Sequence, residues 1–236
     1  MLRLAVQAID QNFRAVLLYI GIHVSVSTAL FFVRIQLMRP PDGEDLSPLL
    51  NMADIGLDIV DGIAWAIAQC VAFAWIGRNL DKPNWKVATA GEALKRFFGF
   101  WLLMDLIGML TFRFLIFSVN AGADPSLVLW LPILYGAGTI PLGAAIMFQQ
   151  RVGTEEVGQA LQTLGHQFPR TLLVVCMAGA GYVFLSMVML QAAEFPFAMP
   201  LVGIIDSVLD CFIFSCTWII CMYHREAIEN DSDIDF

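Results

Sequence analysis

Charged residues are scarce in this sequence. Asp, Glu, Lys and Arg together make up 14% of the 236 residues, whereas hydrophobic residues make up 58%. Soluble domains carry about 25% charged residues, so this composition excludes an ordinary soluble protein. Long polar stretches are missing as well. The longest, MRPPDGEDLSPLLNM at 38–52, has the Pro, Gly and Asp content of a loop. No soluble catalytic domain fits into such a stretch.

Apolar runs take the place of the missing polar sequence. A transmembrane helix needs about 20 consecutive, mainly apolar residues. Six such runs occur, at 14–38, 56–77, 97–118, 127–148, 170–192 and 199–222. The sequence therefore predicts an all-α polytopic membrane protein with six transmembrane helices in three hairpins.

Lysine and arginine are unevenly distributed between the two sides predicted by this topology. Only Arg34, Arg39 and Arg113 lie on the side away from the termini. The ten others lie on the terminal side: Arg3, Arg14, Arg78, Lys82, Lys86, Lys95, Arg96, Arg151, Arg170 and Arg225. Because Lys and Arg are enriched in cytoplasmic loops, we expect both termini in the cytoplasm, together with an acidic tail at 226–236.

Internal repeats divide the single membrane domain, 1–236, into three units at approximately 1–78, 84–151 and 154–225. Amphipathic segments precede the first, third and fifth apolar runs. GEAL at 91–94 matches GQAL at 158–161, and QNFRAVLL at 11–18 matches HQFPRTLL at 166–173. We expect each unit to be an interfacial amphipathic helix followed by a transmembrane hairpin.

The repeat segments GEALKRFFGFWLLMDLIGML and GQALQTLGHQFPRTLLVVCMAGAG carry a family resemblance. The chain resembles uncharacterised six-helix bacterial membrane families, which include the membrane domain attached to some glycerophosphodiester phosphodiesterases. The resemblance implies a six-helix fold and a bacterial inner membrane. It does not imply the phosphodiesterase activity, because that activity belongs to a separate domain of those proteins.

Carboxylates inside the apolar runs are the candidate functional residues: Asp58, Asp61, Asp105, Asp206 and Asp210. Such residues are costly in a bilayer and face the bundle interior, a water-filled cavity or a partner. On a helix, Asn51, Asp54, Asp58 and Asp61 fall within an arc of about 80°. Arg34 and Arg113 lie at the depth of Asp54 and Asp58.

Three interpretations of these aspartates are open. Arg34 and Arg113 neutralise the outer aspartates and fix the helix ends, or the aspartates form a proton or cation pathway towards Asp105 and Asp210, or they form a docking surface for foreign helices or lipid headgroups. Asp105 and Asp210 have no cation at matching depth in the sequence. We expect them to be protonated and to donate hydrogen bonds to other helices.

Other side chains have structural interpretations. His23 is expected to be a hydrogen-bonded packing residue. The small residues of YGAGTIPLGAA at 135–145 and CMAGAGY at 176–182 indicate close helix packing. Tryptophans near the predicted boundaries indicate an aromatic belt: Trp75, Trp85, Trp101, Trp130 and Trp218.

The sequence contains no reaction motif, metal motif or cofactor motif. We expect no enzymatic activity, no cofactor and no metal. The net charge of −8 comes from the tail and one outer loop, so nucleic acid is not an expected partner. The favoured function is a non-enzymatic membrane subunit or scaffold that packs against lipids, other membrane proteins or further copies of itself. The alternative is a small proton- or cation-coupled transporter that uses the intramembrane aspartates.

Overall fold

The computed structural model describes residues 1–37, 48–120, 122, 124, 126–192 and 198–232. All its regular elements in these ranges are α-helices, which confirms the predicted all-α class. They are α1 (Leu2–Gln11), α2 (Phe13–Leu37), α3 (Pro48–Leu80), α4 (Ala90–Asn120), α5 (Ser126–Phe148), α6 (Thr154–His166), α7 (Phe168–Ala192) and α8 (Ala198–Ser232).

Five helices are long and apolar enough to cross a membrane. Their apolar segments are Phe13–Gln36, Met52–Leu80, Ala90–Leu115, Phe168–Val188 and Pro200–Asn230. The sixth predicted span corresponds to α5, in which the described apolar part, Ile133–Phe148, is shorter. The chain is thus a helical membrane protein with several candidate transmembrane helices.

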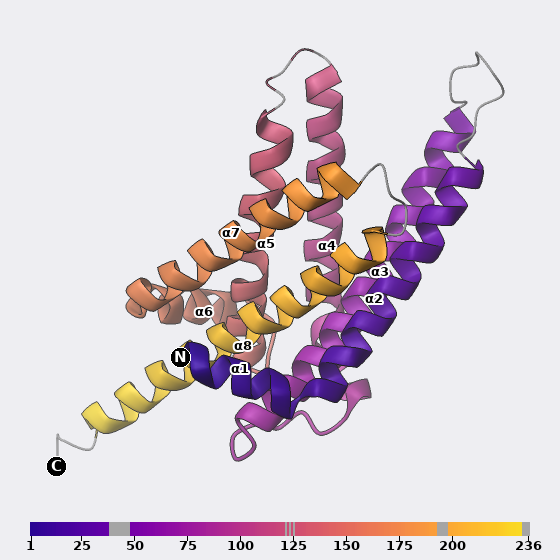
Figure 1. Cartoon of the computed structure of the whole chain (residues 1–236). Coiled ribbons are helices and arrows are strands. Elements are labelled where there is room, and N and C mark those ends of the chain that lie inside the picture. The colour runs from indigo at the N-terminus through magenta and orange to yellow at the C-terminus, as the bar shows by residue number, and fades with distance from the viewer. Residues whose placement is uncertain (38–47, 121, 123, 125, 193–197, 233–236) are drawn as a thin grey trace.

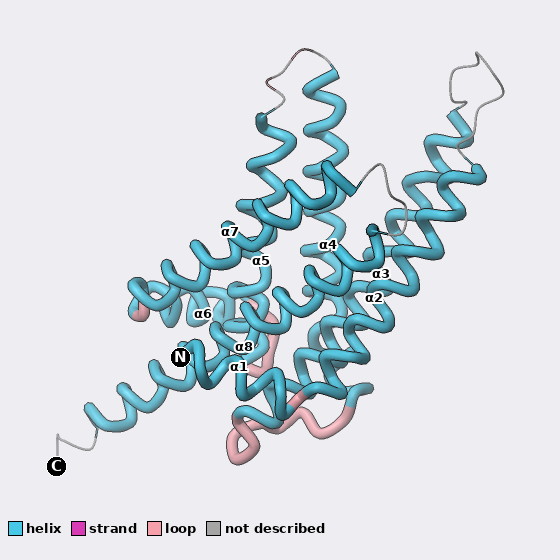
Figure 2. The backbone as a smooth tube through the Cα atoms, in the orientation of Figure 1, coloured by secondary structure: helices cyan, strands magenta, loops and turns pink. Residues whose placement is uncertain are grey.

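Three helix pairs build the bundle: α2 with α3, α4 with α5, and α7 with α8 (Figure 1). In this view the pairs α2–α3 and α4–α5 diverge away from the termini, and the pair α7–α8 crosses in front of α4 (Figure 1). The longest described loop, 81–89, lies at the opposite end, close to α1 (Figure 2). Helix α8 is the centre of the fold, because it contacts α1, α2, α3, α5, α6 and α7.

Aromatic side chains fill the core around α8. Phe73 and Phe214 stack with ring centroids 4.3 Å apart, and Trp101 packs against the edge of Phe73 at 5.5 Å. Trp101 and Trp218 are fully buried. The aromatic-belt prediction is therefore wrong for these two tryptophans, because their rings fill space between helices instead of lying at the membrane surface.

The first and third repeat units break between their helices at equivalent residues. The backbone N–H of Asn12 donates to Ala8 O at 3.0 Å and ends α1, while its carbonyl accepts the Ala15 N–H at 2.8 Å and starts α2. Gln167 has the same two roles between α6 and α7. The alignment of QNFRAVLL with HQFPRTLL predicts this correspondence. Helices α2 and α7 that follow have the same length, 25 residues.

The second unit departs from the predicted pattern. The expected interfacial helix at 84–97 is absent as a separate element: residues 84–89 lie in a loop, and α4 begins directly at Ala90. Thr89 causes this start, because its Oγ1 accepts the Glu92 N–H at 3.2 Å while Glu92 Oε2 accepts the Ala88 N–H at 2.8 Å. The arrangement is a variant of the capping box, in which Glu92 binds the N–H of the residue before the N-cap Thr89.

A buried ion pair holds the terminal end of the bundle together. Arg225 of α8 donates to both carboxylate oxygens of Asp81, at 2.7 and 2.9 Å. Asp81 is 3% exposed and also accepts a bond from Asn84 Nδ2 at 2.9 Å. Asp81 thus ties the end of α3 to α8 and shapes the loop that leads to α4.

Replacing this carboxylate tests its structural role. Asp81→Asn is expected to reduce the free energy of unfolding by about 2 kcal/mol, because hydrogen bonds to charged groups are among the stronger ones. The measurement is the thermal denaturation midpoint of the detergent-purified protein. Asp10→Asn, an exposed change of the same type, is the control. Equal midpoints for the two variants would show that the pair does not stabilise the fold.

Candidate functional site

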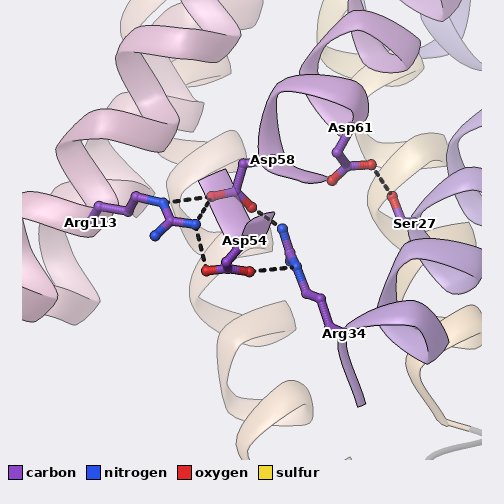
Figure 3. Close-up of polar contacts among 6 residues, drawn as sticks. All are labelled: Ser27, Arg34, Asp54, Asp58, Asp61 and Arg113. Atoms are coloured by element: carbon purple, nitrogen blue, oxygen red, sulfur yellow. Dashed lines mark hydrogen bonds and ion pairs between the residues drawn. The ribbon is translucent and has the colours of Figure 1, made fainter. Parts of the chain in front are cut away.

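An ion cluster joins α2, α3 and α4 in the half of the bundle away from the termini (Figure 3). Asp54 and Asp58 of α3 lie between Arg34 of α2 and Arg113 of α4. Arg34 Nε is 3.1 Å from Asp54 Oδ1, and Arg113 donates to Asp54 Oδ2 and Asp58 Oδ2 at 2.6 Å each. Arg34 also pairs with Asp58. The predicted pairing of the outer aspartates with these arginines is confirmed.

The cluster is balanced in formal charge, with two carboxylates and two guanidinium groups. Each aspartate contacts both arginines, so α3 is linked to α2 and α4 through the same side chains. The aspartate side chains are 21% and 16% exposed. Such a bidentate network fixes geometry, which makes it a structural element and leaves no vacant charge for a ligand.

Asp61 lies outside this cluster although it shares the predicted helix face. Its Oδ1 accepts a hydrogen bond from Ser27 Oγ of α2 at 3.0 Å (Figure 3). Arg34 interacts with Asp61 electrostatically at longer range. Asp58 and Asp61 are thus about one turn of α3 apart. Asp58 is neutralised by arginines, whereas Asp61 bonds to a neutral hydroxyl group.

Asp210 of α8 is enclosed in the core, where two tyrosines bind it. Tyr19 of α2 donates to Asp210 Oδ2 at 2.9 Å, and Tyr182 of α7 donates to Oδ1 at 2.5 Å. The carboxyl group is 3% exposed. The sequence predicts a protonated carboxyl group that donates a hydrogen bond to another helix. In the structure both carboxyl oxygens instead accept bonds, because tyrosine hydroxyls from two neighbouring helices supply the donors.

A cavity of about 570 Å³ lies beside these groups, among α2, α3, α5, α7 and α8. Asp61 and Asp206, which come from different hairpins, both line it, and so does Tyr182. Most other lining residues are apolar: Val24, Phe31, Phe32, Trp65, Ile133, Gly136, Leu185, Pro200, Val202 and Gly203. The cavity thus combines an apolar wall with two carboxyl groups.

Asp206 differs from the other membrane aspartates. Asp206 is half-buried and lines the cavity. Within the part of the chain that the structure describes, Asp206 makes neither a hydrogen bond nor an ion pair. Asp210, one turn along α8, interacts with it electrostatically. A buried carboxyl group without a partner is costly and is typical of a functional position.

His23 and Asp105 complete the polar groups near the cavity. His23 bonds through Nδ1 to Ser207 Oγ at 2.7 Å and packs on Trp65, with ring centroids 3.6 Å apart. The predicted packing role of His23 is confirmed. Asp105 of α4 does not line the cavity. It packs against Gly62 of α3 and interacts electrostatically with Asp210 and Asp61.

Sequence reasoning missed the hydroxyl groups that bind the aspartates. Ser27 and Tyr182 are each the fifteenth residue of their 25-residue helices, α2 and α7. Each donates to an aspartate on the second helix of the same hairpin. The repeat alignment, extended along these two helices, could have found this equivalence.

Known proteins add no family assignment. Comparisons with protein-family models, with curated proteins and with solved structures found no match. The resemblance to six-helix bacterial membrane families therefore remains a prediction, and the site must be interpreted from its own geometry.

Proposed function

We propose that this protein is a small membrane transporter whose substrate site is the cavity lined by Asp61 and Asp206. The observation that supports the proposal is the placement of two carboxyl groups from separate hairpins around one cavity between the helices. Intramembrane carboxyl groups that face a cavity are typical of substrate and ion pathways. Binding sites between helices of a bundle are also a common location for ligands.

The aspartates differ in their binding partners, and this difference supports the same function. Asp54 and Asp58 are neutralised by arginines, and Asp210 is bound by two tyrosines. Asp206 has no such partner in the described chain, so its charge is free to respond to an occupant of the cavity. Among the described residues, Asp61 bonds to a neutral hydroxyl group, that of Ser27. These two residues are the proposed proton- or cation-coupling groups.

Tyr182 connects the cavity to the core of the bundle, so a ligand in the cavity can change contacts in the core. It lines the cavity and donates to Asp210 at 2.5 Å. Tyr19 joins the same carboxyl group to α2. A ligand that displaces Tyr182 would therefore alter a contact between α7, α8 and α2. Alternating access requires that such contacts between helices have two arrangements.

The proposed topology has six crossings with both termini in the cytoplasm of a bacterial cell. Helix α5 is the proposed sixth span, because its 23 residues extend for about 35 Å at 1.5 Å per residue. The cavity-lining residues of α2 start ten residues after the beginning of this helix at Phe13. The cavity accordingly lies in the half of the bundle away from the termini.

The function favoured by the sequence, a non-enzymatic accessory subunit alone or in an oligomer, is the second candidate. Apolar side chains project from α4 and are exposed, among them Leu103, Leu110, Phe114 and Phe117. Such a face suits lipid chains and a partner helix equally. It does not discriminate between the two functions. The cavity with its unpartnered carboxyl group is the feature that favours transport.

Transport can be tested without knowledge of the substrate by measuring whether the cavity is accessible from both sides of the membrane. Ser186 lines the cavity, and Ser186→Cys in a variant without the five native cysteines is treated with a membrane-impermeant thiol reagent. Right-side-out and inverted vesicles are compared. Lys86→Cys and Asp124→Cys serve as controls that report one side each. A transporter is expected to label at Ser186→Cys in both vesicle types. Labelling from one side only would contradict transport.

A further inference from the structure

The chemistry of the cavity specifies its ligand beyond the proposed function on which this inference rests. We propose that the cavity binds an organic cation with an apolar body, such as an aryl or alkyl ammonium ion. The observations that carry this proposal are the signs of the lining charges, the unpartnered Asp206 and the aromatic wall.

The lining charges exclude an anionic ligand. Among the described residues, Asp61 and Asp206 are the acidic groups of the lining, and no described lysine or arginine lines it. Arg34 lies near Asp61 but its guanidinium group pairs with Asp54 and Asp58. An anion in the cavity would meet like charges in a low-dielectric surrounding, which is strongly unfavourable.

A bound cation would supply the partner that Asp206 lacks. The Asp206 side chain is half-buried, lines the cavity and has no hydrogen bond or ion pair among the described residues. His23, the basic side chain among the described lining residues, bonds to Ser207 and packs against Trp65, so it does not fill this role. Pairing a desolvated carboxylate with a desolvated cation is favourable, since either group alone is costly to bury.

The remaining wall matches an apolar body attached to that cation. Phe31, Phe32 and Trp65 lie on one side, from α2 and α3, and Leu185 and Val202 lie on the other, from α7 and α8. Aromatic rings bind organic cations through their faces and bury alkyl groups. A volume of about 570 Å³ accommodates a small organic molecule.

A bare metal ion is a poorer match for this cavity. Metal ions need several oxygen, nitrogen or sulfur ligands close together. Among the described residues, no group of three or more His, Cys, Asp or Glu side chains could hold a metal ion. The mostly apolar wall would also leave such an ion without its hydration shell.

Three related probes separate charge from apolar contact. Benzyltrimethylammonium has both features, tetramethylammonium lacks the aryl group, and phenylmethanesulfonate has the aryl group with a negative charge. Isothermal titration calorimetry on the detergent-purified protein measures their affinities. We expect benzyltrimethylammonium to bind at least about tenfold more tightly than tetramethylammonium, and phenylmethanesulfonate not to bind. Equal binding of the cation and the anion would overturn the proposal, as would no binding of either cation.

Variants assign the binding to the cavity. Asp206→Asn is expected to weaken benzyltrimethylammonium binding at least about tenfold, and Thr28→Trp, which fills the cavity, is expected to abolish it. Glu155→Gln makes the same charge change on exposed α6 and should leave affinity unchanged. Each variant is first shown to elute as a folded, monodisperse species. Unchanged affinity in Asp206→Asn would contradict the assigned site.

Failure of this inference is distinguishable from failure of transport. Two-sided labelling of Ser186→Cys without cation binding would leave a transporter with another class of substrate. Cation binding with one-sided labelling would leave a membrane receptor for organic cations. Both results together are expected.

Discussion

Gly143→Ala is expected to remove most of the folded protein. Gly143 of α5 lies directly against the indole ring of Trp101 on α4, and a Cβ atom at this position would overlap the ring. The ring cannot move aside easily, because it is fully buried, bonds to Met147 Sδ at 3.4 Å and packs on Phe73. Overpacking of this kind costs about 1–3 kcal/mol or more. The measurement is the yield of monodisperse protein by size-exclusion chromatography.

A second glycine of α5 provides the matched control. Gly138 has no atom within 4 Å of the position its Cβ would take, so Gly138→Ala should fold as the unmodified protein does. Alanine also favours the helix over glycine by up to about 1 kcal/mol. If both variants lost folded protein equally, the close contact between α4 and α5 at Trp101 would be wrong.

Asp58→Asn is expected to have the largest effect among changes to the ion cluster. The carboxylate of Asp58 contacts both Arg34 and Arg113. After the change, both guanidinium groups must pair with the carboxylate of Asp54. We expect the free energy of unfolding to fall by about 2 kcal/mol. This loss of stability is smaller than the loss expected for a fully buried ion pair, because the arginine side chains are 33% and 31% exposed. Reversible unfolding in mixed detergent micelles measures it.

A double-mutant cycle separates this interaction from a general loss of packing. Arg113→Gln alone removes one of the two cations, and the double variant with Asp58→Asn restores the charge balance of the cluster. The double variant should therefore be more stable than the sum of the single effects predicts. Strictly additive losses would mean that Asp58 and Arg113 act independently.

Much of the architecture could be predicted from the sequence, because the spacing of apolar and charged residues depends on the local geometry of a helix. Apolar runs locate the helices, and the i, i+4, i+7 spacing of Asp54, Asp58 and Asp61 places them on one face. Arg34 and Arg113 lie at matching depth, so their pairing with that face was predictable. The repeated segments around Asn12 and Gln167 also located two helix breaks.

The cavity could not be predicted, because it depends on how the hairpins rotate relative to one another. Helical spacing cannot say that Asp61 turns towards Ser27 while Asp58 turns towards the arginines. Tyr19 and Tyr182 resemble ordinary core aromatics in the sequence, and only their packing against α8 brings them to Asp210. Small residues similarly predicted close packing of α5 without revealing that Gly143 faces Trp101.

The most direct test of the central claim is substrate counterflow. Proteoliposomes that contain the purified protein are loaded with unlabelled benzyltrimethylammonium and diluted into a trace of the labelled cation. The label should accumulate transiently in vesicles with the unmodified protein and with Glu155→Gln, and not with Asp206→Asn or in empty vesicles. No accumulation with the unmodified protein, in a preparation that binds the cation in detergent, would contradict transport through this cavity.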